Sequence, residues 1–310
     1  MNIEDIFTQK NDYIDSTLSK IDNRLQTAQK KLLDLLIDEI VTQFDVGKDN
    51  IILNTPKNIR LLSNIDKVYD YFNKTFVNNI TSGYAQSFLK VTDFNRDYFA
   101  GMGFKESTLN KIFEASKSVQ QSIGITQSKG KAVVTPGGYL DGITEAGEVR
   151  QKLKQYTLNS INSKIDLQDF AKGMRELVEG AGEEAGILQS YWQQYAFDTM
   201  SIADRAESLY VAEQLKLRCF VYSGQRAKKS SRPFCKGGYD KVAGKTFKNK
   251  IGQVFIVDEF RKLYQDMEFQ GRIPGGDIVH TLGGYNCLHN PMFISDKEAI
   301  RRDPSLKDKL

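Results

Sequence analysis

The sequence of 310 residues is poor in the residues that mark several large classes of protein. Three cysteines are too few for a disulfide scaffold, and they favour a reducing cytoplasm. Six prolines and 24 glycines exclude collagen-like and other fibrous chains. No apolar run reaches about 18 residues, so no transmembrane helix is expected. The opening residues lack the basic and apolar regions of a secretory signal, so none is expected.

The remaining composition is typical of a globular protein, with 40 % hydrophobic and 26 % charged residues. The net charge of +4 conceals an uneven distribution. Residues 1–215 carry 24 basic and 29 acidic side chains, whereas residues 216–310 carry 19 basic and 10 acidic ones. The chain therefore joins an acidic body to a basic C-terminal module. This asymmetry favours an acidic partner for the module, such as nucleic acid.

Apolar residues near the start repeat with the spacing of a heptad: Ile14, Leu18, Ile21, Leu25, Ala28, Leu32 and Leu35. This spacing predicts a long helix, which we expect to end near Gly47. Two interpretations are open. The helix packs against its own domain, or it pairs with a second subunit and makes an oligomer.

Helical periodicity returns in residues 63–123, 146–163, 166–179 and 183–216, with Asp166 as the expected N-cap of the third helix. After Lys216 the pattern changes to short β-type runs, such as 219–222, with one helix expected over 258–270. The predicted fold class is α+β, a mainly helical body with a small α+β domain. The predicted organisation is a helical N-terminal region (1–127), a glycine-rich loop or arm with a short hairpin (128–147), a helical body (148–216), a small basic α+β domain (217–295) and a polar tail (296–310).

Chemically reactive residues concentrate in the C-terminal module. Both histidines, His280 and His289, lie there with two of the three cysteines, Cys235 and Cys287. Together they would supply four zinc ligands, although their spacing is not that of the usual zinc motifs. The alternative is a pair of buried thiols beside histidines that hydrogen-bond to loop carbonyls.

No motif of a hydrolase, metalloprotease or phosphate-binding loop occurs in the sequence, and no residue is assigned a catalytic role. A nuclease-like or zinc-dependent site remains the alternative. It would use Arg232, His280, Asn286 and His289 on a bound phosphodiester. A third interpretation is that the same loop only holds the small domain together.

A basic run follows the first predicted strand of the module. It comprises Arg226, Lys228, Lys229 and Arg232. Four positive charges in one loop suit contact with the phosphates of double-stranded DNA, without reading of the bases. The alternative is a solvated surface loop.

The module resembles the C-terminal domain of phage Mu F-like minor head proteins and related head-morphogenesis proteins of tailed phages. The resemblance covers about residues 205–292, and Leu288 departs from it because the family often has arginine there. The matching residues are Tyr222, Gly224, Arg232, Pro233, Phe234, Cys235, Lys245, Phe247, Gly283, Gly284, Tyr285, Asn286, Cys287 and His289.

The resemblance implies a structural component of the virion rather than an enzyme. Proteins of this kind are present in few copies in the phage head, beside the portal, and act in head assembly, DNA packaging or DNA ejection. The expected partners are portal or other capsid proteins and double-stranded DNA. The expected locations are the phage head and, during assembly, the host cytoplasm. No cofactor is expected, and a structural zinc ion is the one alternative.

Overall fold

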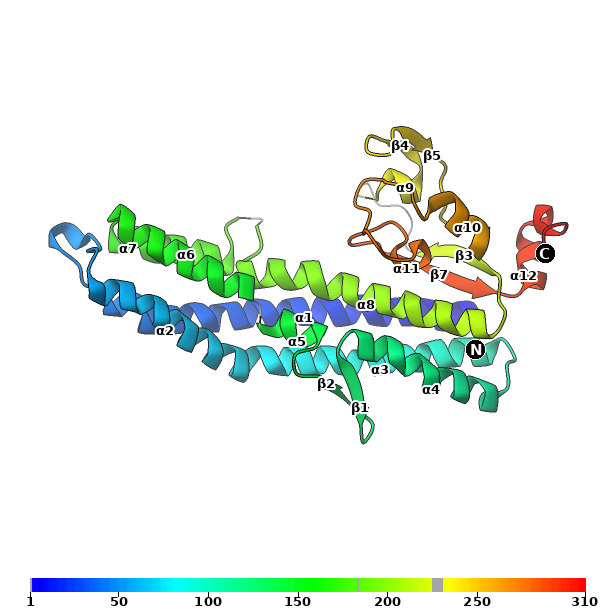
Figure 1. Ribbon diagram of the computed structural model, residues 1–310, viewed down its shortest axis with the longest axis horizontal. Helices are drawn as coiled ribbons and strands as arrows, with labels where there is room; N and C mark the ends of the chain where they lie inside the picture. The colour runs from blue at the N-terminus through cyan, green and yellow to red at the C-terminus, as the bar shows by residue number, and fades with distance from the viewer. Residues whose placement is uncertain (1, 146, 183, 225–230) are drawn as a thin grey trace. The chain divides into compact units, whose positions relative to one another are not determined.

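The computed structural model describes residues 2–145, 147–182, 184–224 and 231–310 (Figure 1). Long helices dominate, and two small antiparallel sheets, of three and two strands, lie in the C-terminal region, so the predicted mainly helical α+β class is confirmed. The chain divides into two compact units. The first unit comprises Met1–Asp15, Phe88–Ile123 and Ala196–Leu310, and the second comprises Ser16–Ser87 and Gly124–Tyr195.

These units differ from the contiguous domains predicted from the sequence. Three long helices supply residues to both units, namely α1 (Ile3–Glu39), α3 (Asn78–Gly101) and α8 (Ile187–Gln214). The predicted boundary at residue 216 therefore does not separate the basic module from the helices before it. A unit boundary inside a continuous helix leaves no glycine-rich or proline-rich linker, so composition does not reveal it.

The second unit is mainly helical. It contains α2 (Pro56–Phe72), the π-helical turn Asn73–Val77, α5 (Tyr139–Glu145), α6 (Gly147–Ser163) and α7 (Leu167–Glu179), besides parts of α1, α3 and α8. The Asp166 side chain accepts a hydrogen bond from Gln168 N at 2.7 Å and so caps α7, as predicted. Trp192 is fully buried beside the Tyr84 ring in this unit.

The heptad seam of α1 is covered by the chain itself. Ile21, Leu25, Ala28 and Leu32 are all at most 7 % exposed. The interpretation in which α1 packs within its own chain is therefore favoured, and the seam is not available for pairing with another subunit. The helix also ends at Glu39, before a short 3₁₀ turn at Val41–Gln43, and not near Gly47 as expected.

Two connections are more ordered than the sequence indicates. Helical periodicity was expected only from residue 63, but α2 already begins at Pro56, where Thr55 caps it by accepting from Asn58 N at 3.2 Å. The glycine-rich segment forms the expected hairpin, from β1 (Ile125–Ser128) and β2 (Lys131–Val134). It then continues into the unexpected helix α5, at the end of a stretch without helical periodicity.

The first unit combines helices with the sheet. Helix α4 (Glu106–Ser122) follows α3. The three-stranded antiparallel sheet has the order β6-β3-β7. Its strands are β6 (Val254–Ile256), β3 (Cys219–Gly224) and β7 (His289–Ile294). The smaller elements are α9 (Pro233–Lys236), β4 (Gly238–Asp240), β5 (Lys245–Phe247), α10 (Val257–Tyr264) and α11 (Ile278–Thr281). Helix α10 is shorter than the helix expected over 258–270.

The sheet packs through aromatic rings. Phe220 on the central strand contacts the rings of Phe255, Phe260 and Phe293. Tyr98 on α3 donates its hydroxyl proton to the carbonyl of Phe293 on β7. The segment predicted as a polar tail also folds, into α12 (Asp296–Arg302) and the turn Pro304–Leu306, and buries Leu306.

A buried polar network joins helices α1, α3 and α8 in the first unit. Lys10 Nζ lies 2.9 Å from Asp204 Oδ1, and Asn95 donates to both Asp204 and Glu207. Glu207 also accepts from Thr92 at 3.0 Å. Burial of Glu207 raises its carboxyl pKa to about 7, although hydrogen bonds from Asn95 and Thr92 oppose the rise. This carboxyl therefore exchanges its proton near neutral pH.

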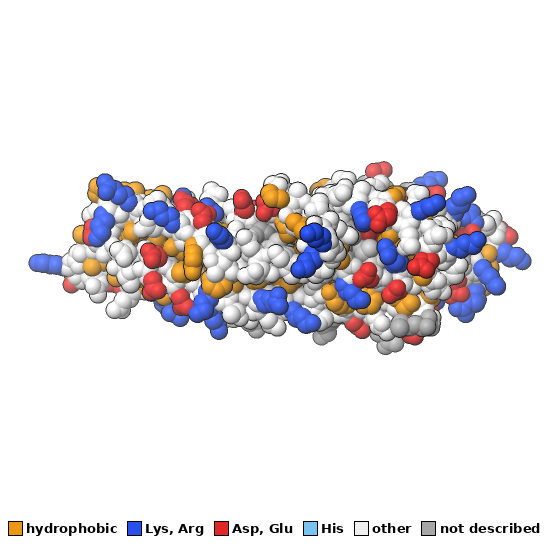
Figure 2. All heavy atoms as spheres, turned by 90° about the horizontal axis from the view of Figure 1, so that it is seen from below, with side chains coloured by type: hydrophobic (Ala, Val, Ile, Leu, Met, Phe, Trp, Pro, Cys, Tyr) orange, Lys and Arg blue, Asp and Glu red, His pale blue; other side chains and the backbone are white. Residues whose placement is uncertain are grey.

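Charges of both signs mingle on the surface. On the face drawn in Figure 2, lysine and arginine side chains lie among acidic ones, with apolar groups scattered between them. None of the helices that the structure describes is long and apolar enough to span a membrane. This agrees with the expectation from the sequence.

Candidate functional site

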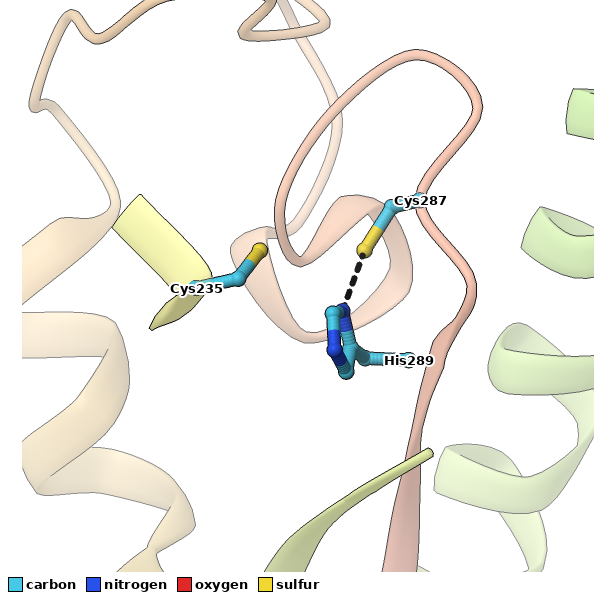
Figure 3. Close-up of side chains that lie close together, drawn as sticks. All are labelled: Cys235, Cys287 and His289. Carbon is cyan, nitrogen blue, oxygen red and sulfur yellow. Dashed lines mark hydrogen bonds between the residues drawn. The ribbon is translucent and has the colours of Figure 1, made fainter. Parts of the chain in front are cut away.

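Cys235, Cys287 and His289 meet in the interior of the first unit (Figure 3). Cys235 lies on the short helix α9, Cys287 on the loop before β7, and His289 at the first position of β7. One ligand atom from each residue lies within 4.8 Å of the other two. All three side chains are at most 4 % exposed. We call these three residues the Cys/His cluster.

Hydrogen bonds tie the Cys/His cluster to its surroundings. The Tyr222 hydroxyl lies 3.2 Å from Cys235 Sγ, and the Gly283 N–H donates to Cys287 Sγ at 3.3 Å. His289 Nδ1 is 3.5 Å from Cys287 Sγ. The other ring nitrogen of His289, Nε2, is buried without a hydrogen-bond partner in the described structure. The imidazole therefore has bonding capacity that its protein neighbours leave unused.

The environment stabilises a thiolate at Cys287. A hydrogen bond from the Cys235 thiol lowers the pKa of Cys287 well below its usual value, and His289 and the Arg205 charge act in the same direction. The same hydrogen bond, together with burial, raises the pKa of Cys235, which acts as the donor. The pair therefore favours one negative sulfur within a buried site.

Two motif glycines make this geometry possible. A Cβ atom on Gly283 would lie 2.3 Å from Cys235 Sγ and 2.9 Å from Cys287 Sγ. Gly284 has φ +85°, and its Cβ would lie 1.7 Å from the carbonyl oxygen of Gly271. Any side chain at either position would displace the loop that carries Cys287.

Arg232 fastens the two halves of the site. Its Nη1 donates to the Gly283 carbonyl at 3.0 Å and also to the Tyr285 carbonyl. These contacts connect the start of α9 with the loop that precedes Cys287. Nη1 is therefore bonded within the protein, and the predicted DNA contact at Arg232 stays a prediction. The other predicted DNA contacts, Arg226, Lys228 and Lys229, lie outside the described residues.

The sequence did not reveal the role of Arg205. This residue of α8 is 2 % exposed, and its Nε donates to Asn290 Oδ1 at 3.0 Å. Its two terminal nitrogens donate to the carbonyls of His280 and Cys287. The sequence held one signal of this burial. Arg205 is three residues after Ile202 and four before Leu209, which places a charged residue on the apolar face of the helix.

His280 does not join the cluster, so the predicted set of four zinc ligands is reduced to three. Its contribution to the site is the backbone carbonyl that accepts from Arg205. Burial lowers the pKa of its imidazole. His280 lies nine residues before His289, so the sequence suggested that the two rings meet. His280 belongs to α11, and residues 282–288 lie between this helix and His289.

The residues of the alternative nuclease-like site do not converge on a described cavity. A cavity of about 210 Å³ lies beside Cys287 and Gly224, between the start of α1 and the β7 loop, and none of Arg232, His280, Asn286 or His289 lines it. Asn286 is exposed, and its N–H donates to Asp198 Oδ1 at 2.6 Å. His289 is buried.

The β4–β5 hairpin presents a basic surface that the sequence-based prediction of a DNA-binding loop did not include. Lys241, Lys245 and Lys248 are exposed on it or next to it. Asp240, the one acidic residue of residues 216–250, is buried and accepts from the N–H groups of Val242 and Gln270. The negative charge of this segment therefore points inward.

Lys250 is also removed from this surface. Its ammonium lies 4.1 Å from the centre of the Phe234 ring and donates to the Phe234 carbonyl at 2.7 Å. Burial lowers its pKa to about 8. The exposed basic surface thus consists of Lys241, Lys245 and Lys248, which we call the lysine hairpin.

Comparison with family models, curated proteins and solved structures finds no match to this chain.

Proposed function

We propose that this chain is a minor head protein of a tailed bacteriophage, and that its basic module contacts packaged double-stranded DNA. One observation carries the proposal. The two halves of the motif, R-P-x-C (232–235) and G-G-Y-N-C-x-H (283–289), are far apart in the sequence and close together in the fold. Residues that matched only by chance would have no reason to contact one another.

The motif residues support one another as expected of a structural signature. Arg232 binds the carbonyls of Gly283 and Tyr285, and Cys235 contacts Tyr222. Gly224 lies against His289, where a Cβ atom would come within 2.9 Å of the His289 Cα. Most of the matching residues thus lie in the core of the small domain, whereas Lys245, Tyr285 and Asn286 are exposed. This is the pattern expected when a motif defines a fold, and it agrees with the non-enzymatic role implied by the resemblance.

The location in the particle can be tested directly. An antibody against the protein should detect it in purified, DNA-filled particles induced from the cells that carry the gene. The signal should correspond to few copies per particle relative to the major capsid protein. A tagged chain should also retain the portal protein when purified from the same cells. Absence from both procapsids and filled particles would refute the assignment to the head.

The charge arrangement predicts how the protein should bind DNA. Replacing the three residues of the lysine hairpin with serine should weaken duplex binding. It should also reduce the slope of log K against log [salt] by up to about 3, because each phosphate contact releases about one counterion. The measurement is a salt titration of DNA affinity by fluorescence anisotropy, on duplexes of unrelated sequence.

A matched control uses three exposed lysines of the second unit. Serine at Lys30, Lys152 and Lys172 removes the same total charge from other surfaces and should leave the slope nearly unchanged. A separate triple variant of Arg226, Lys228 and Lys229 tests the loop predicted from the sequence. If none of the three variants alters the slope, the DNA contact is refuted, while assignment to the head would still depend on the particle experiment.

A further inference from the structure

We infer that Cys235, Cys287 and His289 bind a single zinc ion that joins α9 to the loop before β7. This inference does not depend on the proposed function. It rests on the position, chemistry and surroundings of the Cys/His cluster.

The donor atoms are already near the separation that zinc requires. Zinc–sulfur bonds of about 2.3 Å and zinc–nitrogen bonds of about 2.0 Å, in tetrahedral geometry, place ligand atoms about 3.5–3.8 Å apart. His289 Nδ1 is 3.5 Å from Cys287 Sγ, and no pair in the cluster exceeds 4.8 Å. Shifts of about 1 Å or less complete the arrangement. The backbone therefore holds the three residues in position for the metal.

The donor types also match the metal. Two thiolates and one imidazole form a borderline-soft set that favours zinc over magnesium or calcium. Two negative sulfurs, a neutral histidine and a divalent cation sum to zero charge, as a buried site requires. Binding through His289 Nδ1 would replace its weak 3.5 Å contact with Cys287 Sγ by a metal bond.

The surroundings resemble those of an occupied thiolate site. The Gly283 N–H donates to Cys287 Sγ, and the Tyr222 hydroxyl is placed to donate to Cys235 Sγ. Such outer hydrogen bonds orient and stabilise metal-bound sulfur.

Hydrogen bonds alone explain the cluster less well. Thiols are weak donors and acceptors, so they give little reason to bury two of them beside an imidazole with an unpaired nitrogen. The absence of a side chain at Gly283 brings both sulfurs toward one point, where a Cβ atom would otherwise lie. With three protein ligands among the described residues, the fourth position is left to solvent.

Metal analysis tests the site on the full chain, expressed with zinc in the medium and purified without a metal-affinity tag. We expect about one zinc ion per chain. Cobalt substituted for zinc should give a thiolate-to-cobalt charge-transfer band and the visible bands of a tetrahedral ion. This measurement on the unmodified chain needs no variant to fold. A chelator should lower the melting temperature.

Matched variants locate the ligands. Cys235→Ser, Cys287→Ser and His289→Gln should each lose zinc. Cys219→Ser should keep it, since this third cysteine is equally buried in the same unit but lies outside the cluster. His280→Asn should also keep it. Circular dichroism separates loss of metal from loss of fold.

Three results would overturn the inference. The first is a chain that contains no zinc and gives no cobalt charge-transfer band. The second is retention of zinc by all three cluster variants. The third is a mass lower by two hydrogens with Cys235 and Cys287 joined in one peptide, which would identify a disulfide in place of the metal site.

Discussion

Replacing Arg205 with alanine is expected to destabilise the first unit by about 3–5 kcal/mol. The guanidinium is buried and donates to Asn290 Oδ1 and to two backbone carbonyls of the motif region. Its removal leaves these three acceptors without partners in an environment that excludes water, and it also opens a cavity. Lysine should not rescue the loss, because one ammonium cannot reach three acceptors in the geometry of the planar guanidinium.

Urea unfolding followed by circular dichroism measures this loss. Hydrogen exchange of peptides covering residues 284–294 shows where it acts. Arg175→Ala is the matched control, since Arg175 is an exposed arginine of α7 in the second unit. A loss below about 1 kcal/mol for Arg205→Ala, the size expected of a surface arginine, would show that its hydrogen bonds do not stabilise the motif loop.

Glu207 is expected to make the stability of the first unit depend on pH. Its folded pKa of about 7 lies above the ordinary value of 4.5, so the folded state holds the proton more tightly than the unfolded state. The resulting stabilisation is complete below about pH 4.5 and is lost as the pH rises through about 7. At alkaline pH, the free energy of unfolding is therefore lower by about 3 kcal/mol than it is at acidic pH because of this carboxyl group.

Glu207→Gln should remove this dependence, because the amide keeps the shape and carries no charge. Unfolding free energies of the two proteins, measured from pH 5 to 8, should diverge as the pH rises, with the variant becoming the more stable. Asp204 and Lys10 stay in place in both proteins, so their contributions cancel in the difference. Glu176→Gln, an exposed carboxyl on α7, should run parallel to the wild type. Parallel profiles for Glu207→Gln would contradict a raised pKa.

Local structure could be predicted well from the sequence. Asp166 and Thr55 occupy N-cap positions, and their neighbours define helix starts by short-range hydrogen bonds. Even here the prediction missed Thr55, because helical periodicity was recognised only from residue 63, after Pro56 at the first helical position. The heptad of α1 showed that one face is buried, but periodicity does not say which chain covers it.

The Cys/His cluster could be predicted only in part. The sequence identified Cys235, Cys287 and His289 as candidates but gave no distances, because contacts between residues 235 and 287 depend on the tertiary fold. His280 was equally plausible by residue type, and only the structure excludes it from the cluster. Arg205 was missed since an arginine on a helix is usually exposed, and its burial depends on carbonyls supplied by a distant loop.

The first unit is closed by contacts between the two ends of the chain. Asn290 donates to Asn11, at a sequence separation of 279 residues, and Arg302 pairs with Glu4. The central strand β3 pairs with β7, which follows it by more than sixty residues. During synthesis, the start of α1 therefore leaves the ribosome long before its native neighbours exist. Because pairing of segments so far apart in the sequence is slow, folding of this unit follows synthesis of residues 289–302.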